Sequence, residues 1–349
     1  MIGRFLGRFP RFISTVILGA LAVSVWQATV YVETVVRPRE ATERQAMIDR
    51  EIDRADKLFA RQKYETALNE YEYVLTGFPG ELATNVEGRL RDRVGSCLVE
   101  LAIAENANGN IERGIDSYQA ALELRTAEVD QQAHSETWYR IGEAYMAKSR
   151  AAGEADPVTS AVEAFEAGLA ALSADANAGL YATGLRSIGN AHRRLYELDP
   201  DSNPLDNALR HYQEALRVAK PIEQPIEHGE TLMEIGRSNV LLSERGYRLR
   251  QLKEAIKTFE KALTVFTVET FPRLHASAHR EMGDTYTIMS RLEPKSRSDR
   301  AAHQQRVIRY ENKAKQSYRI AKSFGLEPGF EVAGAAEPTP PPVEEEKKE

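Results

Sequence analysis

Cysteine and tryptophan are scarce in this sequence of 349 residues, which has one cysteine, Cys97, and two tryptophans. A single cysteine excludes an intramolecular disulfide and a zinc site built from cysteines. Cys97 precedes Leu98 in a helical apolar pattern, and this position favours a small buried side chain over a reactive thiol. We therefore expect a fold that is stabilised by the packing of apolar side chains.

The motifs of common enzyme sites are also missing. The sequence has no G-x-x-x-x-G-K-[ST] phosphate loop, no H-E-x-x-H zinc helix and no G-x-S-x-G turn. The nearest approach to a metal site is "HASAH", in which His275 and His279 are one helical turn apart. Two imidazoles are too few ligands for a zinc site. We expect no catalytic residue, no metal and no cofactor, and we do not expect an enzyme.

A basic surface is lacking as well, because the chain carries a net charge of −6 at neutral pH. No cluster of lysines and arginines is interleaved with aromatic residues in the way that nucleic-acid-binding surfaces require. We therefore expect no nucleic acid among the partners.

The amino terminus has a composition of its own. Residues 1–11 contain three arginines and no acid, and Phe12 to Tyr31 are 20 residues without a charged side chain. A helix of that length spans about 30 Å, the thickness of a bilayer's hydrocarbon core. We expect a basic arm at 1–11 and a transmembrane signal-anchor helix at 12–36, which would make this a single-pass membrane protein.

Two other interpretations of the amino terminus stay open. Ala20 and Ala22 offer a small-x-small site at which a signal peptide could be cleaved, giving a secreted protein, and a mitochondrial targeting segment is a third alternative. The side of the membrane is also open, since five arginines follow the apolar segment. A short arm with three arginines is hard to translocate, so we favour the bulk of the chain on the extracytoplasmic side.

The rest of the chain contains an internal repeat. Five glycines lie 47 residues apart, each preceded by an apolar residue: Gly95, Gly142, Gly189, Gly236 and Gly283. Nineteen residues after the first four glycines comes a small residue, followed four later by an aromatic one: Tyr118, Phe165, Tyr212 and Phe259. Each copy therefore predicts two amphipathic helices joined by a turn. A glycine inside a helix costs about 1 kcal/mol relative to alanine, so we expect each to be a site of close helix–helix packing.

The pattern W-x-x-I-G-x-x-Y, Trp138 to Tyr145, followed by A-x-x-x-F, resembles the tetratricopeptide repeat. The match is clearest upstream, where Ala55, Ala67 and Tyr71 have the ordinary spacing of that family. The resemblance implies an all-α solenoid of helical hairpins, and with the predicted anchor the expected fold is such a solenoid preceded by a single transmembrane helix. The 47-residue period also overlaps the lengths of HEAT and armadillo repeats, so another helical solenoid stays open.

The resemblance divides the chain into a short repeat at 43–80 and lengthened repeats at 81–325. In the last copy the second-helix columns are shifted by 12 residues, to Ala314, Tyr318 and Ala321, which indicates an insertion or a lengthened helix around 293–305. The final segment, 326–349, is rich in proline and glutamate and is expected to be a disordered tail.

Solenoids of this kind bind proteins or peptides on a concave surface, so the resemblance implies a membrane-anchored scaffold or adaptor that assembles a protein complex. A self-associating structural solenoid, a homo-oligomer of the cell envelope, is the alternative. Arginines cluster on the first helices of the later copies and could bind the carboxylates of an acidic peptide, either a partner's or the chain's own tail. The predicted peptide-binding residues are Tyr139, Arg186, Asn190, Arg193, Arg237 and Arg280.

Overall fold

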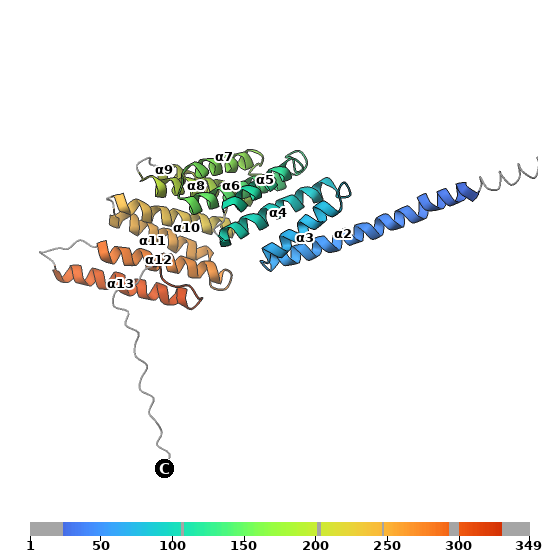
Figure 1. The fold of residues 1–349 in the computed structure, drawn as a ribbon. Helices are drawn as coiled ribbons and strands as arrows, with labels where there is room; N and C mark the ends of the chain where they lie inside the picture. Colours follow the sequence, from blue (N-terminus) through green and yellow to red (C-terminus); the bar gives the residue numbers. More distant parts are fainter. Residues whose placement is uncertain (1–23, 106–107, 201–203, 246–247, 293–299, 330–349) are drawn as a thin grey trace, which may run out of the picture. The chain divides into compact units, whose positions relative to one another are not determined.

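The computed structural model describes residues 24–105, 108–200, 204–245, 248–292 and 300–329, and the regular structure within these ranges is helical (Figure 1). The predicted basic arm, residues 12–23 of the predicted membrane span and all of the tail beyond Gly329 lie outside them. Contacts between Cα atoms divide the chain into two compact units, unit 1 (Met1–Leu124) and unit 2 (Arg125–Glu349). The boundary falls within the range 81–325, for which the repeat pattern predicts one continuous array.

Unit 1 consists of two helical hairpins that follow a short π-helical turn. Its elements are η1 (Val32–Val36), α2 (Arg37–Ala60), α3 (Tyr64–Gly77), α4 (Thr84–Glu105) and α5 (Asn108–Leu122). Helix α2 packs against α3 and α4 against α5, while α3 joins the two pairs by packing on α4. The core between them includes the buried side chains of Ile48, Tyr71 and Leu90.

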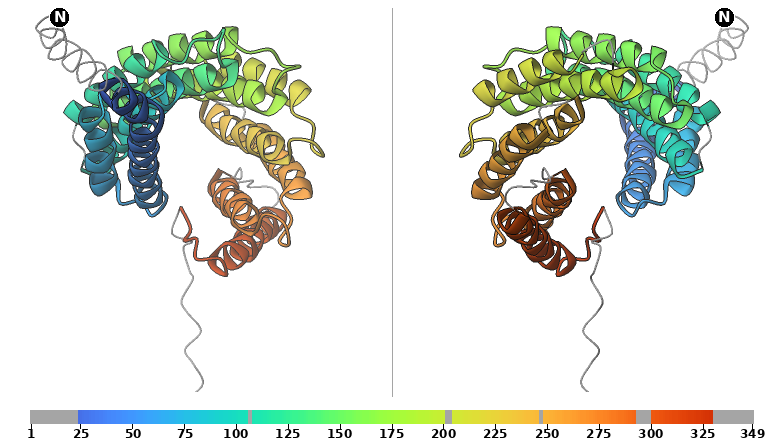
Figure 2. Two further views of the ribbon diagram at one scale, coloured as in Figure 1. Left: turned by 90° about the vertical axis from the view of Figure 1, so that its right-hand side faces the viewer. Right: turned by 90° about the vertical axis from the view of Figure 1, so that its left-hand side faces the viewer.

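Unit 2 repeats the same hairpin along an arc (Figure 2). Its elements are α6 (Gln131–Ala152), α7 (Asp156–Ala170), α8 (Ala178–Leu198), α9 (Leu205–Val218), α10 (Pro225–Leu242), η3 (Ser243–Arg245), α11 (Arg248–Val265), α12 (Pro272–Leu292) and α13 (Arg300–Lys322). The pairs are α6/α7, α8/α9, α10/α11 and α12/α13. The shifted columns of the last copy are confirmed, because Ala314, Tyr318 and Ala321 are buried, and residues 300–305 lengthen α13.

The glycine column is confirmed as the point of closest approach within each hairpin. A Cβ added to Gly142 would lie 2.4 Å from the ring of Phe165, and one added to Gly236 would lie 2.3 Å from the ring of Phe259. The same clash would occur at Gly95, Gly189 and Gly283. The aromatic ring of the second helix therefore packs directly on the backbone of the first, and this contact offsets the intrinsic cost of a helical glycine.

The residue after each column position depends on whether the facing aromatic is tyrosine or phenylalanine. Every tyrosine hydroxyl donates to that residue: Tyr71 to Asp56 (2.6 Å), Tyr118 to Ser96 (3.1 Å), Tyr212 to Asn190 (2.9 Å) and Tyr318 to Asp284 (2.7 Å). Opposite Phe165 and Phe259 the same position holds Glu143 and Arg237. A phenyl ring cannot hydrogen-bond, so these two charged side chains are available for contacts across the first helices.

The first helices of unit 2 form its inner layer. Helix α6 contacts α8, α8 contacts α10, and α10 contacts α12. Among the described residues, no comparable contact joins the second helices of neighbouring hairpins. Stacked hairpins whose first helices touch while their second helices diverge must curve with the first helices inside, and this places them on the concave face.

Three histidines of unit 2 hold the loop that leads into their own first helix, a role that the sequence pattern does not reveal. The Nδ1 atoms of His134, His228 and His275 lie 2.7–2.8 Å from the carbonyl oxygens of Arg125, Ala219 and Phe266. Each carbonyl lies nine residues earlier, just beyond the end of the preceding helix. The imidazole therefore satisfies a carbonyl that has no partner within the helix.

The first described residues continue α2 toward the amino terminus. Residues 24–31 are helical, and α2 extends well past the end of α3 (Figure 1), so the helix begins long before the predicted repeat boundary at residue 43. Pro38 cannot donate a backbone hydrogen bond, and the π-helical turn η1 directly before α2 accommodates it. None of the described helices is both long and apolar enough to cross a bilayer.

His279 gives unit 2 a pH-dependent stability. Burial and the neighbouring His275 lower the pKa of His279 to about 4. The unfolded chain, in which histidine has a pKa of about 6.5, therefore binds more protons between these two values, so stability rises with pH from about 4 to 6.5. Leu185 holds the equivalent position in α8, and we expect His279→Leu to fold and to show a shallower rise. Urea titrations across this pH range measure the slope, and an unchanged slope would contradict the assignment.

Candidate functional site

The predicted peptide-binding residues lie on the first helices of unit 2. Helix α6 carries Tyr139, helix α8 carries Arg186, Asn190 and Arg193, and helices α10 and α12 carry Arg237 and Arg280. The four arginines are brought together on the inner layer, but each also faces a glutamate.

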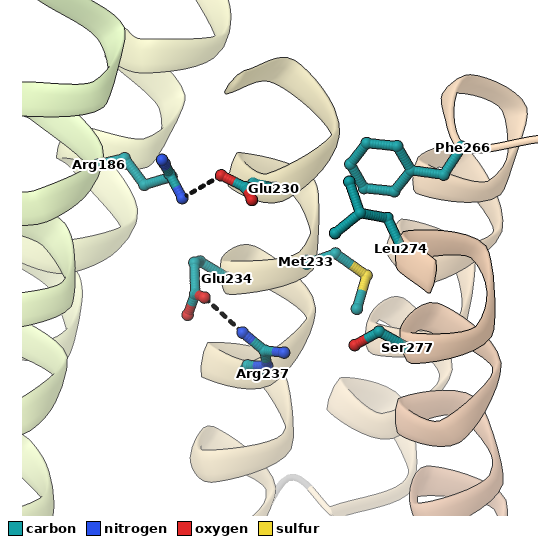
Figure 3. A pocket seen from close by; sticks show the side chains of 8 residues that line it. All are labelled: Arg186, Glu230, Met233, Glu234, Arg237, Phe266, Leu274 and Ser277. Atoms are coloured by element: carbon teal, nitrogen blue, oxygen red, sulfur yellow. Dashed lines mark hydrogen bonds and ion pairs between the residues drawn. The ribbon is translucent and has the colours of Figure 1, made fainter. Parts of the chain in front are cut away.

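These charges form an alternating network that runs from one hairpin to the next. Arg186 on α8 pairs with Glu230 on α10 at 2.6 Å (Figure 3). Two nitrogens of Arg237 on α10 donate to Oε1 of Glu281 on α12, at 3.0 and 3.2 Å. Figure 3 also shows the pair between Arg237 and Glu234, one turn apart on α10.

Two further contacts extend the network at its ends. Arg193 on α8 lies 3.5 Å from Glu234 and also pairs with Glu197 on its own helix. Arg280 on α12 pairs with Glu281 at 3.2 Å. The predicted arginines are therefore paired with glutamates that were not predicted, and the cluster is not a patch of positive charge alone.

The missed glutamates leave a signal in the sequence. Arg186 and Glu230 are 44 residues apart, as are Arg237 and Glu281. In an array with a period of 47 residues, this separation places each acid one helical turn before the arginine's own column in the next copy. A glutamate 44 residues after an arginine is therefore the sequence signal for both pairs.

Partial burial strengthens these pairs. The side chains of Glu234, Glu281 and Arg237 are 10%, 17% and 31% exposed. Burial alone would lower the pKa of Arg193 and Arg237, but the adjacent carboxylates more than offset it, so both pKa values lie above the usual arginine range. The arginines remain charged, and removing one would leave carboxylates in a poorly solvated position.

Asn190 and Tyr139 differ from their predicted roles. The side-chain oxygen of Asn190 accepts a hydrogen bond from Tyr212 inside the hairpin. Tyr139 is buried: a Cβ added to Gly168 would lie 2.6 Å from its ring, and one added to Gly184 would lie 2.2 Å from its hydroxyl oxygen. The expectation that Tyr139 faces the groove is wrong, because small residues on α7 and α8 create space that the tyrosine ring fills.

A pocket of about 100 Å³ opens beside the network, between α8, α10 and α12 (Figure 3). Its lining combines charged and apolar side chains: Arg186, Glu230, Met233, Glu234, Arg237, Phe266, Leu274 and Ser277. The ion pairs lie on one side, and Phe266, Leu274 and Met233 lie on the other (Figure 3). Such a lining suits an apolar side chain whose own backbone is held by polar groups.

A second pocket, of about 280 Å³, lies in unit 1 between α2 and α4. Its acids already have partners in the fold. Asp56 accepts from Tyr71 at 2.6 Å and from Arg89 at 3.2 Å, and Asp53 pairs with Lys57 at 2.5 Å. The described residues contain no group of three side chains that could hold a metal ion. We therefore regard the unit 2 pocket as the better candidate site.

Searches against protein-family models and curated protein sequences gave no match. Solved structures are similar in fold. A signal transduction ATPase with numerous domains that has a tetratricopeptide repeat sensor, from Pyrococcus horikoshii, superposes with a TM-score of 0.50 at 15% identity. The match covers 89% of this chain and 44% of that one, so this chain spans less than half of that protein.

BtubC from P. vanneervenii is also similar, with a TM-score of 0.49, 14% identity, and coverage of 81% of this chain and 95% of that one. MamA matches 60% of this chain and 93% of its own length at 19% identity, with a TM-score of 0.38. At these identities only the fold is informative. The helical hairpins, their small-residue contacts and the likeness to a protein with a tetratricopeptide repeat sensor together show that this chain has the tetratricopeptide-repeat fold.

Proposed function

We propose that this protein is a scaffold that binds an extended segment of a partner protein along the inner layer of unit 2. The observation that carries the proposal is the pocket between α8, α10 and α12, in which an apolar floor adjoins a row of ion-paired side chains. An extended peptide exposes backbone donors and acceptors on its edges and side chains on alternate faces. The charged row can bond to its backbone while the pocket receives one apolar side chain.

The paired charges favour this partner over a strongly acidic one. Each arginine of the network already faces a glutamate, so an acidic segment would have to displace an existing partner. A segment with an apolar anchor and a single acid can use the pocket and one arginine. Arg280 is the most suitable arginine, since its side chain is 38% exposed, more than that of Arg186, Arg193 or Arg237.

Attachment to a membrane belongs to the same proposal. The helix before α2 exposes a run of large apolar side chains: Val25, Trp26, Val30, Tyr31 and Val32. Together with the uncharged sequence from Phe12 onward, they support an anchor that holds the partner near the bilayer, where a complex assembles. We further propose that the repeats lie on the extracytoplasmic side. Mass spectrometry of the mature amino terminus, with protease accessibility in intact cells, tests cleavage and side together.

Filling the pocket tests partner binding without disturbing the ion pairs. Ser277 lines the pocket, and Ser277→Trp places an indole in it. The matched control is Glu163→Trp, at an exposed position of the outer helix α7. Affinity capture from detergent-solubilised membranes with the wild type and both variants, compared by mass spectrometry, is the measurement. We expect Ser277→Trp to capture at least about tenfold less partner than the wild type, which corresponds to about 1.4 kcal/mol of binding free energy. Glu163→Trp should capture as much partner as the wild type. Equal capture by the two variants would contradict the proposal.

A further inference from the structure

After α13 the chain turns back toward the groove, which is the inner layer of unit 2 with its pocket between α8, α10 and α12. Helix α13 ends at Lys322, and Gly325 follows with φ +79°, a left-handed conformation that favours glycine. The backbone N–H of Gly325 donates to Lys322 and that of Leu326 donates to Ala321, at 2.9 and 3.2 Å. These bonds reverse the chain at the carboxyl end of the helix.

The reversed segment returns to α12 at a position of the inner layer. The backbone N–H of Gly329 donates to Oδ1 of Asp284 at 3.0 Å, and the hydroxyl of Tyr318 donates to the same oxygen at 2.7 Å. The approach is close, because a Cβ on Gly329 would lie 2.6 Å from Oδ2 of Asp284. Asp284 directly follows Gly283, so it stands in the same column as Arg237 of α10.

Gly329, the last described residue, contacts Asp284, which lies one helical turn after Arg280 of the network. The sequence continues Phe330, Glu331, Val332, and an extended chain advances about 3.3 Å per residue. Neighbouring packed helices are about 8–10 Å apart, so three residues are enough to cross from α12 to α10. Arg280 is nearer still, because it lies on α12 itself, one turn before Asp284, and its side chain is 38% exposed.

We propose that residues 330–337 of this chain occupy its own groove, with the Glu331 carboxylate facing Arg280, and that they compete there with the partner. The inference rests on the groove of the proposed function and assigns its regulation. Gly329 anchors the segment to Asp284, and Glu331 is complementary in charge to the arginine that it meets. A tethered segment has an effective concentration of about millimolar, so even a weak contact would be occupied in the absence of partner.

Proteolysis of the full chain in detergent, without partner, tests the contact directly. A glutamate-specific protease can cleave after Glu331 and after Glu344, and the second site is an internal reference outside the proposed contact. Rates at both sites are divided by those in a synthetic peptide of residues 326–349, which removes any preference of the protease. We expect cleavage after Glu331 to be at least about tenfold slower in the protein than cleavage after Glu344, because cleavage follows the population of the released state.

Gly329→Ala should release the segment, since its Cβ would lie 2.6 Å from Oδ2 of Asp284 and would force the segment and that carboxylate apart, and it should restore cleavage after Glu331 to within about twofold of the reference. Gly179→Ala is the matched control, because a Cβ there meets its neighbours at an ordinary 3.6 Å, and it should leave the protection intact. Arg280→Gln should give faster cleavage after Glu331, as it removes the charge that faces that residue.

Two results would overturn the inference. One is equal normalised cleavage after Glu331 and Glu344 in the wild type, and the other is protection that persists in Gly329→Ala. Neither result bears on partner binding, which Ser277→Trp tests separately. If both proposals hold, Gly329→Ala should capture more partner from solubilised membranes than the wild type does.

Discussion

Replacing Gly189 with leucine should destabilise unit 2 by about 3 kcal/mol, the upper end of the range for overpacked sites. The first added atom alone would lie 2.4 Å from Cε1 of Tyr212, and that ring is fully buried. Neither the ring nor the backbone of α8 can move away without opening the hairpin. Urea titration followed by circular dichroism measures the effect as a lower midpoint, which is the quantity to compare because repeat arrays need not unfold in two states.

The control for this variant is Gly179→Leu, in the first turn of the same helix. There an added Cβ meets its nearest neighbours at 3.6 Å, an ordinary contact distance. We expect its free energy of unfolding to remain within about 0.5 kcal/mol of the wild-type value, so that its urea midpoint is nearly unchanged. If Gly189→Leu has the same midpoint as Gly179→Leu, the packing role of the glycine column is wrong.

Replacing Arg237 with methionine should cost about 3 kcal/mol at neutral pH, since it leaves Glu234 and Glu281 without their shared cation in a poorly solvated position. Protonation of either carboxylate would relieve the repulsion between them. The variant therefore binds protons more readily when folded than when unfolded, and its stability relative to the wild type should recover as the pH falls. Urea titrations at neutral and acidic pH measure both effects.

Two comparisons isolate the charge. Arg273→Met, at an exposed position of α12, should change the midpoint little at any pH. Adding Glu234→Gln to Arg237→Met should restore part of the lost stability, because one of the two facing carboxylates is then neutral. A loss in Arg237→Met that is the same at neutral and acidic pH would mean that the arginine acts through its packed methylene groups and not through its charge.

The proteins that resemble this one in fold do not identify its partner. They share the helical hairpin at about 15% identity, and proteins with one fold carry many functions. Under the proposed function, the groove is the feature that specifies what this chain can bind. Its charge pairs and its apolar pocket come from side chains that vary between the copies of this array, such as Arg186, Met233 and Arg280 in one column.

The sequence by itself determined the helical hairpins of this protein and the points at which their helices meet. Apolar spacing within a helix and small residues facing aromatic ones are local patterns, so Gly142 with Phe165 and Gly236 with Phe259 could be paired by counting along the chain. The shifted last copy could be aligned in the same way, because Tyr318 packs on Gly283 only if the extra residues lengthen α13.

Only the tertiary structure decided which side chains face the groove and which are paired. Tyr139 and Arg186 share a column, yet the first is buried between glycines of neighbouring helices and the second reaches Glu230 of the next hairpin. Gly329 meets Asp284 across 45 residues because α13 ends in a left-handed glycine that reverses the chain. These contacts join residues that are far apart in the sequence, and their existence depends on how the helices pack within and between hairpins, which the local pattern of a single helix does not encode.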